Sequence, residues 1–132
     1  MATDWSSVRR YFETDAVAHV ATLMPDGAPH SVPVWVGVEG EGLAIFMLAG
    51  SRKDRNLQRD PRVALSVTSP GSDLDMAFVR GRAVARIEGD DAMPLVDRIA
   101  RAYTGDPYPI RAGLAAYLIE PAVCWARDYT ED

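Results

Sequence analysis

The stretch AVAHVATLMPDGAPHSVPVWVGV, residues 16–38, carries much of the information about the fold. Its first part, residues 16–24, is mostly apolar and β-prone. Pro25-Asp26-Gly27 then supplies a turn, because proline fixes φ and glycine accepts a positive φ. Residues 28–38 resume as a strand with valines at alternate positions. Two such strands across a tight turn predict an antiparallel hairpin.

Further short strands and a few helices are predicted after and before this hairpin. The pattern predicts strands at 43–49, 62–69, 75–88, 112–119 and 121–127, the last two being separated at Pro121. It predicts helices at 4–14, 51–59 and 90–103. Strands joined mostly by tight turns are typical of an antiparallel barrel and not of a doubly wound sheet. The sequence contains no GxGxxG or GxxxxGK motif, which argues against the dinucleotide-binding and P-loop folds.

Composition limits the class of protein. A chain of 132 residues with 48% hydrophobic and 25% charged residues predicts a single globular domain spanning residues 1–132. No apolar run reaches the roughly 18–20 residues of a membrane span, and the first residues lack the features of a signal peptide. One cysteine and two histidines argue against internal disulfides and a zinc site, so we expect a cytoplasmic protein. A net charge of −5 argues against nucleic-acid or membrane partners.

Positive charge is concentrated in one segment. Of the 14 lysines and arginines, five fall within residues 52–62, including the only lysine, Lys53. The segment opens a predicted helix that Ser51 can cap, with Asp54 at the third helical position. Arg52 and Lys53 have the wrong sign for a helix start, at a cost of about 0.3–1 kcal/mol each, unless an anion binds there. The segment predicts either a phosphate site or a solvated basic helix face.

Other residues allow a functional and a structural interpretation. Pro33 lies inside a regular strand, where its missing N–H requires an edge, a bulge or a ligand-lined position. Trp35 shares a face with Pro33, and taken alone the pair favours an edge strand with a tryptophan in the core or at a dimer interface over a ligand site. We expect His19 to be half-buried and Cys124 to be an inert packing residue. No Ser-His-Asp or Cys-His arrangement can be identified, so the catalytic residues are unknown.

Two blocks of the sequence carry a likeness to a known family. H-V-A-T-L-M-P-D-G-A-P-H-S-V-P-V-W (19–35), followed by S-R-K-D-R-N-L-Q-R-D-P-R-V-A-L-S-V (51–67), resembles the pyridoxamine 5′-phosphate oxidase-like split β-barrel superfamily. The likeness is greater to its flavin/deazaflavin oxidoreductase B branch, often assigned to coenzyme F420, and covers nearly the whole chain. It implies a six-stranded antiparallel split β-barrel of the FMN-binding type. It also implies a homodimer with two cofactor sites at the interface.

The resemblance also implies roles for particular residues. The cofactor phosphate would be held by Ser51, Arg52, Lys53, Arg55 and Asn56. The tricyclic ring would lie along Pro33, Val34 and Trp35, with backbone contacts from Met47 and Ala49 and an approach from Leu74 of the partner subunit. Relatives often carry an aromatic residue at the position of Leu74. The strand motif lacks the extended FMN-phosphate pattern of true pyridoxamine phosphate oxidases, so oxidation of vitamin B6 is not expected.

The implied activity is that of an F420-dependent reductase that transfers hydride between the deazaflavin and a small organic acceptor, such as an electron-poor alkene or imine. An FMN-dependent oxidoreductase on the same fold is one alternative. A non-catalytic protein that binds a flavin, haem or another tetrapyrrole is another. Because the cofactor performs the hydride transfer, no acid–base constellation is required. Substrate contacts are expected from loops 70–75 and 104–111, with Tyr103 and Tyr108 as candidate proton donors.

Overall fold

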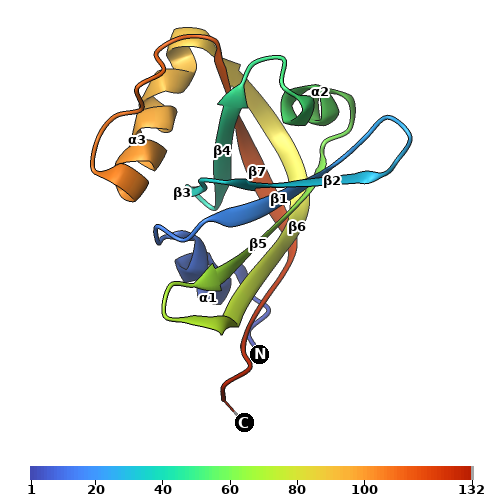
Figure 1. Ribbon diagram of the computed structural model, residues 1–132. Helices are drawn as coiled ribbons and strands as arrows, with labels where there is room; N and C mark the ends of the chain where they lie inside the picture. Colours follow the sequence, from blue (N-terminus) through green and yellow to red (C-terminus); the bar gives the residue numbers. More distant parts are fainter. Residues whose placement is uncertain (132) are drawn as a thin grey trace.

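The computed structural model describes residues 1–131, in which strands predominate over short helices (Figure 1). The strands are β1 Ala18–Leu23, β2 Pro29–Val34, β3 Gly37–Glu39, β4 Gly42–Leu48, β5 Arg62–Ser69, β6 Ser72–Glu88 and β7 Leu114–Asp128. The helices are α1 Trp5–Val8, α2 Arg52–Arg59 and α3 Met93–Thr104, with 3-10 turns at Arg9–Phe12 and Gly89–Ala92. The predicted mainly-β class with small helices is confirmed. Within residues 1–131, no helix has both the length and the apolar character needed to cross a bilayer.

The strand count is seven within the described residues, where six strands were expected. The predicted strand 28–38 is broken at Trp35 and Val36, so that β2 and β3 are separate. In contrast, the two strands predicted around Pro121 are one strand, β7, with a register shift in its pairing to β6. Pro121 lies opposite Gly81 there, and a Cβ on Gly81 would lie 2.0 Å from the Glu120 carbonyl oxygen. The bulge thus accommodates the proline, and the glycine permits the close approach.

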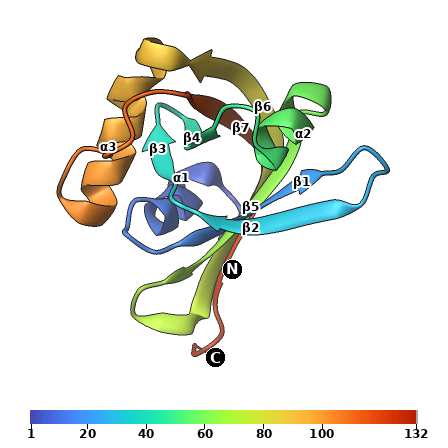
Figure 2. The same ribbon diagram turned by 45° about the horizontal axis from the view of Figure 1, so that its top comes forward.

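All the strands belong to one antiparallel sheet with the order β2-β1-β5-β6-β7-β4-β3. Its two edge strands, β2 and β3, are consecutive in the chain and are joined only by Trp35 and Val36. The sheet curls until β3 continues from the end of β2, and β2 and β4, which do not pair, are left on opposite sides of an opening, here called the split (Figures 1 and 2). Helix α2 covers one end of this split and α3 flanks the other side of the barrel.

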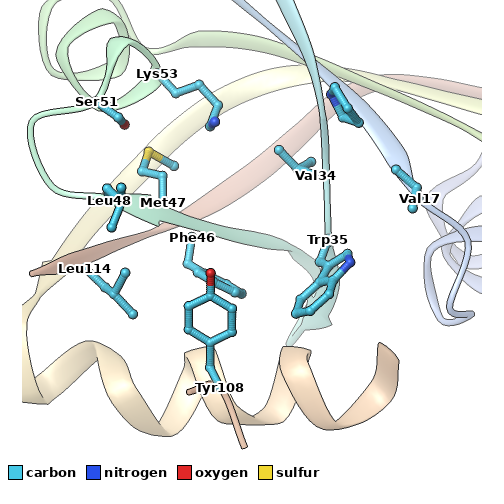
Figure 3. A pocket seen from close by; sticks show the side chains of 11 residues that line it. Val17, Val34, Trp35, Phe46, Met47, Leu48, Ser51, Lys53, Tyr108 and Leu114 are labelled. Atoms are coloured by element: carbon cyan, nitrogen blue, oxygen red, sulfur yellow. The ribbon is translucent and has the colours of Figure 1, made fainter. Parts of the chain in front are cut away.

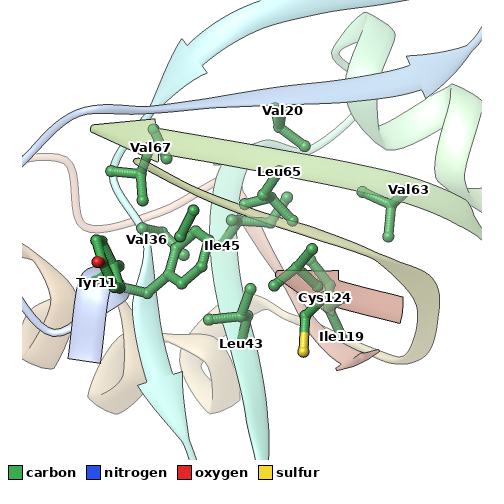
Figure 4. Packing of buried hydrophobic residues seen from close by; sticks show 14 of the residues in the cluster. Tyr11, Val20, Val36, Leu43, Ile45, Val63, Leu65, Val67, Ile119 and Cys124 are labelled. Carbon is green, nitrogen blue, oxygen red and sulfur yellow. The ribbon is translucent and has the colours of Figure 1, made fainter. Parts of the chain in front are cut away.

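Two apolar clusters hold the sheet in this shape. The larger fills the barrel interior with side chains from β1, β4, β5 and β7, among them Val20, Ile45, Leu65 and Ile119, all at most 2% exposed (Figure 4). The smaller lies beneath α3, where helical spacing buries Val96 and Ile99 against β4 and β7. Burial of these faces from water is the main force that closes the sheet and fixes the position of the split.

Candidate functional site

A cleft of about 460 Å³ opens at the split, a volume within the usual range for small-molecule sites (Figure 3). Its walls come from β2, β4, the start of α2 and the loop that precedes β7. The lining is mostly apolar and consists of Val17, Pro33, Val34, Trp35, Phe46, Met47, Leu48, Ser51, Lys53, Tyr108 and Leu114. Polar side chains therefore lie at two places only, the start of α2 and Tyr108.

The cleft brings together sequence-predicted residues from three separate elements. Pro33, Val34 and Trp35 come from the edge strand β2 and the link after it, which satisfies the requirement that the proline lie at a sheet edge. Met47 comes from β4, and Ser51 and Lys53 come from the first turn of α2. Figure 3 shows these side chains facing a common space, with the Lys53 ammonium at one end and Tyr108 at the other.

The remaining predicted residues lie outside the cleft lining. Ala49 follows β4, is exposed and donates its N–H to the Gly113 carbonyl at 2.8 Å. Arg52 is half-buried and Arg55 is exposed. Leu74 is 52% exposed at the far end of the β5–β6 hairpin, and it lies in strand β6, where a loop was predicted.

Asn56 supports α2 from within the protein. It is fully buried, and its amide nitrogen donates to Thr22 Oγ1 at 3.0 Å and to Met24 Sδ at 3.6 Å. These bonds tie the middle of α2 to β1 and direct the Asn56 side chain away from the cleft lining.

The first turn of α2 is fixed by an ion pair between the buried Asp54 and the half-buried Arg86, which the sequence did not reveal. Ser51 Oγ accepts the predicted capping bond from the Asp54 N–H at 3.4 Å. The Asp54 carboxylate accepts from the Gly50 N–H at 2.8 Å, from Tyr117 Oη at 2.6 Å, and from Arg86 Nε and Nη2 at 2.8 Å each. The Arg86 guanidinium is the largest cause that lowers the pKa of Asp54 to about 2. The helix start is thereby joined to β6 and β7.

Lys53 has the opposite environment. Its side chain lines the cleft, and none of the ion pairs within residues 1–131 includes it. Burial lowers its pKa, which shows that the cleft wall removes part of the water around the ammonium. The amides at the start of a helix also lack intrahelical acceptors. A half-buried cation beside free amides favours the phosphate-site interpretation over a solvated helix face.

The opposite end of the cleft is aromatic. Trp35 stacks on Tyr103, with ring centroids 5.1 Å apart and planes at 14°. Tyr108 meets Phe46 and Trp35 edge to face, at centroid distances of 4.9 and 6.0 Å. Such arrangements are favourable for aromatic quadrupoles and restrict the rings to defined positions. This end of the cleft is therefore a preformed flat-walled slot.

Tyr103 supports the slot from behind. Its hydroxyl donates to the Ala16 carbonyl at 2.7 Å and accepts from the Val36 N–H at 3.1 Å, and burial raises its pKa. Ala16 leads into β1 and Val36 leads into β3, so one hydroxyl connects the two sides of the split. The structure thus favours a structural role for Tyr103 over the predicted one of proton donor.

The other chemically reactive groups lie away from the cleft lining. Cys124 is buried, and burial raises the pKa of its thiol, in agreement with an inert packing role. His19 was expected to be half-buried but is exposed, because Ala18 and Val20 occupy the core-facing side of β1. Among the described residues, no group of three or more His, Cys, Asp or Glu side chains could hold a metal ion.

Comparison with known proteins agrees with this architecture. Residues 6–125 match the family model described as pyridoxamine 5′-phosphate oxidase. No sequence match was found among curated proteins. The solved structure of an F420 reductase is similar with a TM-score of 0.79 and 25% identity, covering 89% of this chain and 94% of that one.

Two mycobacterial structures share the fold. A conserved hypothetical protein from Mycobacterium tuberculosis has a TM-score of 0.74 and 22% identity, over 93% of this chain and 83% of that one. A heme binding protein from Mycobacterium smegmatis has a TM-score of 0.71 and 20% identity, over 100% of this chain and 57% of that one.

Proposed function

The chain belongs to the pyridoxamine 5′-phosphate oxidase family, and from this premise we propose that it is an oxidoreductase that binds coenzyme F420 and transfers hydride to a small organic acceptor. The family and the F420 reductase neighbour together support a flavin- or deazaflavin-type oxidoreductase or binding protein. The choice of F420 over FMN rests on the neighbour's name and on the sequence blocks 19–35 and 51–67.

The observation that carries the proposal is the division of the cleft into a cationic end and a flat apolar end. Lys53 faces the cleft without a carboxylate partner among residues 1–131, at the start of a helix whose amides favour an anion. Trp35 and Phe46 wall the other end. A cofactor that joins a planar ring system to a phosphate matches both ends at once.

Different residues of the cleft would hold the phosphate and the ring of such a cofactor. Lys53 provides a mobile point charge for the phosphate and Ser51 a hydroxyl, while the α2 dipole adds to the attraction. Pro33, Val34 and Met47 offer an apolar surface for the ring. The bound coenzyme would supply the hydride, and the protein would orient it and exclude water. Arg52 and Arg55 lie outside the lining and would contribute only long-range attraction.

We also propose that the protein acts as a homodimer. Val17 and Leu48 are 48% and 56% exposed at the rim of the cleft, although they are apolar. A second copy of the chain would cover this rim and bring Leu74 of the partner subunit toward the cleft. Light scattering at micromolar concentration tests this, and a monomer across that range would contradict it.

Parallel fluorescence titration with oxidised F420 and with FMN tests the cofactor. F420 is expected to quench protein fluorescence with micromolar affinity, because Trp35 lines the cleft, and FMN is expected to bind less tightly. Trp125→Phe is the control, since Trp125 lies outside the cleft lining and its removal should leave the quenching intact. Tighter binding of FMN would support the flavin alternative. No micromolar affinity for either would exclude both enzyme functions, and a Soret band in the purified protein would support the haem-binding alternative.

A further inference from the structure

On the basis of the proposed function, we propose that Arg86 is a positioning residue for the anion-binding end of the cleft, although it lies outside the cleft lining. Arg86 holds and neutralises the carboxylate of Asp54, the sequence neighbour of Lys53. The Lys53 ammonium is thereby left without a negative partner among residues 1–131, so that its charge is available to the phosphate of a ligand.

The Asp54 carboxylate has both of its oxygens engaged away from the cleft. Oδ1 accepts from Arg86 Nε at 2.8 Å and from Tyr117 Oη at 2.6 Å. Oδ2 accepts from Arg86 Nη2 and from the Gly50 N–H, at 2.8 Å each. Two guanidinium donors on two carboxylate oxygens form a bidentate, charge-assisted pair, which fixes direction as well as distance. The carboxylate is therefore directed toward β6 and β7 and is not part of the cleft lining.

A β-bulge in β6 directs Arg86 toward this carboxylate. Arg82 is exposed, and strict alternation would place Arg86 on the same outer face of the strand. The pairing with β7 shifts between Ala83 and Ala85, so that β6 contains one extra residue there. Arg86 consequently lies opposite the buried Tyr117, and both side chains reach Asp54. Bulges redirect side chains in this way and are frequent beside functional sites.

The same carboxylate also holds the loop between β4 and α2. Gly50 lies in this loop with a φ of +83°, a conformation that glycine adopts readily, and its N–H donates to Asp54. Leu48 before the loop and Ser51 after it both line the cleft. The bonds from Arg86 to Asp54 therefore connect β6 to two residues of the cleft wall.

Lys53 shows the result of this separation of charges. Its ammonium points into the cleft in Figure 3. Burial lowers its pKa, whereas a carboxylate close to the ammonium would raise it. Asp54 follows Lys53 directly in the chain and yet does not compensate for that burial. The direction of the Asp54 side chain therefore decides how much positive charge the cleft presents.

Removal of Arg86 would change the charge at this end of the cleft. Asp54 would then be an uncompensated carboxylate one residue from Lys53, and it would either pair with the ammonium or repel a bound phosphate. Glu88 also accepts from Arg86, at 2.7 Å, but 66% of its side chain is exposed, so that water screens its charge. An ion pair that only stabilised the fold would instead leave the anion affinity of the folded protein unchanged.

The single lysine of the chain allows a test without any ligand. When lysine is labelled with ¹³C at its ε carbon, an NMR titration follows Lys53 alone. We expect a higher Lys53 pKa in Arg86→Met than in the wild type, because the released Asp54 carboxylate favours the ammonium. The double variant Asp54→Asn/Arg86→Met should return the pKa to the wild-type value. Arg80→Met removes an exposed charge from the same strand and should leave the pKa nearly unchanged. An unchanged pKa in Arg86→Met, or an equal rise in the double variant, would overturn the proposal.

Fluorescence titration with oxidised F420 provides the second readout. Arg86→Met should bind F420 about tenfold more weakly than the wild type, because it releases a negative charge, whereas Asp54→Asn removes that charge and should bind at least as tightly. The double variant should lie within about threefold of the wild type. Similar weakening in all three variants is the result expected of a merely structural pair, and it would refute the positioning role.

The test does not depend on the folding of Arg86→Met. Asp54→Asn keeps the size of the side chain, and the double variant contains no buried carboxylate that lacks a counter-ion. If Arg86→Met does not fold, a loss of about tenfold in the F420 affinity of Asp54→Asn overturns the proposal, and unchanged or tighter binding supports it. Failure of the proposed function is distinguishable, because the wild type would then bind no F420, while the titration of Lys53 would still decide the role of Arg86.

Discussion

Lys53 and Asp54 are neighbours in the first turn of α2, yet their side chains have opposite environments. Asp54 is fully buried and accepts hydrogen bonds from Gly50, Tyr117 and both donor nitrogens of the Arg86 fork. Lys53 lines the cleft and has no carboxylate partner among the described residues. The same contrast separates Tyr103, whose hydroxyl is occupied, from Tyr108, whose hydroxyl is free. Satisfied groups position the cleft, and unsatisfied groups in it are available to a ligand.

The largest effect on stability is expected from breaking the ion pair between Asp54 and Arg86. Arg86→Met would leave the Asp54 carboxylate in the interior without its counter-ion, where its side chain is only 1% exposed. We expect unfolding free energy to fall by about 3–5 kcal/mol, measured by urea denaturation. The matched variant Lys53→Met removes a cation from the same turn and should cause no such loss. Equal losses in the two variants would mean that the buried pair has no special role.

Acidic pH should weaken the same ion pair between Asp54 and Arg86. The pKa of Asp54 is about 2, below its ordinary value of 3.8, chiefly because Arg86 bonds to the charged form. Stability from this group is therefore present above about pH 4 and is lost as the pH falls through about 2, amounting to about 2 kcal/mol.

Urea unfolding between pH 2 and pH 6 would measure this dependence. Asp54→Asn should flatten the curve in that window. Asp60 also has a pKa of about 2, because Arg62 bonds to it at the surface, so Asp60→Asn is the control for a titration outside the core. A flatter curve for Asp60→Asn than for Asp54→Asn would contradict the assignment.

On the cleft side of the comparison, Lys53→Ala should weaken F420 binding about 10- to 100-fold, which corresponds to the loss of one charged hydrogen bond of about 1.5–3 kcal/mol. Fluorescence titration measures it. Arg62→Ala makes the same change in net charge but lies outside the cleft lining, so it should leave affinity nearly unchanged. Arg55→Ala should have a small effect, because this side chain is exposed and lies outside the cleft lining. Similar losses in all three would point to general electrostatic attraction.

The two tyrosines provide a milder test. Tyr103→Phe leaves the Val36 N–H and the Ala16 carbonyl without their shared partner, and should cost about 1–3 kcal/mol of stability. Tyr108→Phe removes a hydroxyl that bonds to no described residue and should change stability by less than about 0.5 kcal/mol. Thermal or urea unfolding compares the two variants. A larger loss of stability in Tyr108→Phe than in Tyr103→Phe would contradict the assignment of an occupied hydroxyl to Tyr103 and a free one to Tyr108.

The smallest effect concerns Lys53 and stability. Removing its charge from the helix start should raise the unfolding free energy by about 0.3–1 kcal/mol. Burial already lowers the pKa of Lys53, so its charged form is disfavoured in the folded protein. The gain in Lys53→Ala should therefore diminish as the pH rises and the wild-type lysine loses its proton. Urea denaturation of the wild type and Lys53→Ala at pH 7 and pH 10 measures this gain. A larger gain at pH 10 than at pH 7 would contradict the prediction.

Local sequence patterns predicted those parts of the molecule that depend on neighbouring residues. The hairpin around Pro25-Asp26-Gly27, the cap by Ser51 and the position of Lys53 in the first helical turn all follow from short-range chemistry. The break at Trp35–Val36 was missed, because the valine alternation continues across it. The burial of His19 was also predicted wrongly, because β1 is largely apolar on both sides and the pattern does not show which side faces the core.

The contacts that distinguish structural from available groups are long-range and could not be predicted. Asp54 and Arg86 are 32 residues apart, and Tyr103 bonds to Ala16 and Val36 at separations of 87 and 67 residues. Alternation shows which face of a strand a residue occupies, but it does not identify a partner on another element. The sequence thus shows the excess of basic over acidic residues in 52–62. It does not show that Arg86 pairs with Asp54 and neutralises the charge of that carboxylate.

The two-residue link between the edge strands also bears on the order of folding. The walls of the cleft approach each other only after strands distant in sequence have paired, as His19 does with Ser66 and Leu43 with Ile119. Topologies dominated by such pairings fold slowly, because large loops must close first. The cleft therefore completes late, and a ligand that needs both walls can bind only the finished protein. Such a ligand should slow unfolding while leaving the folding rate unchanged.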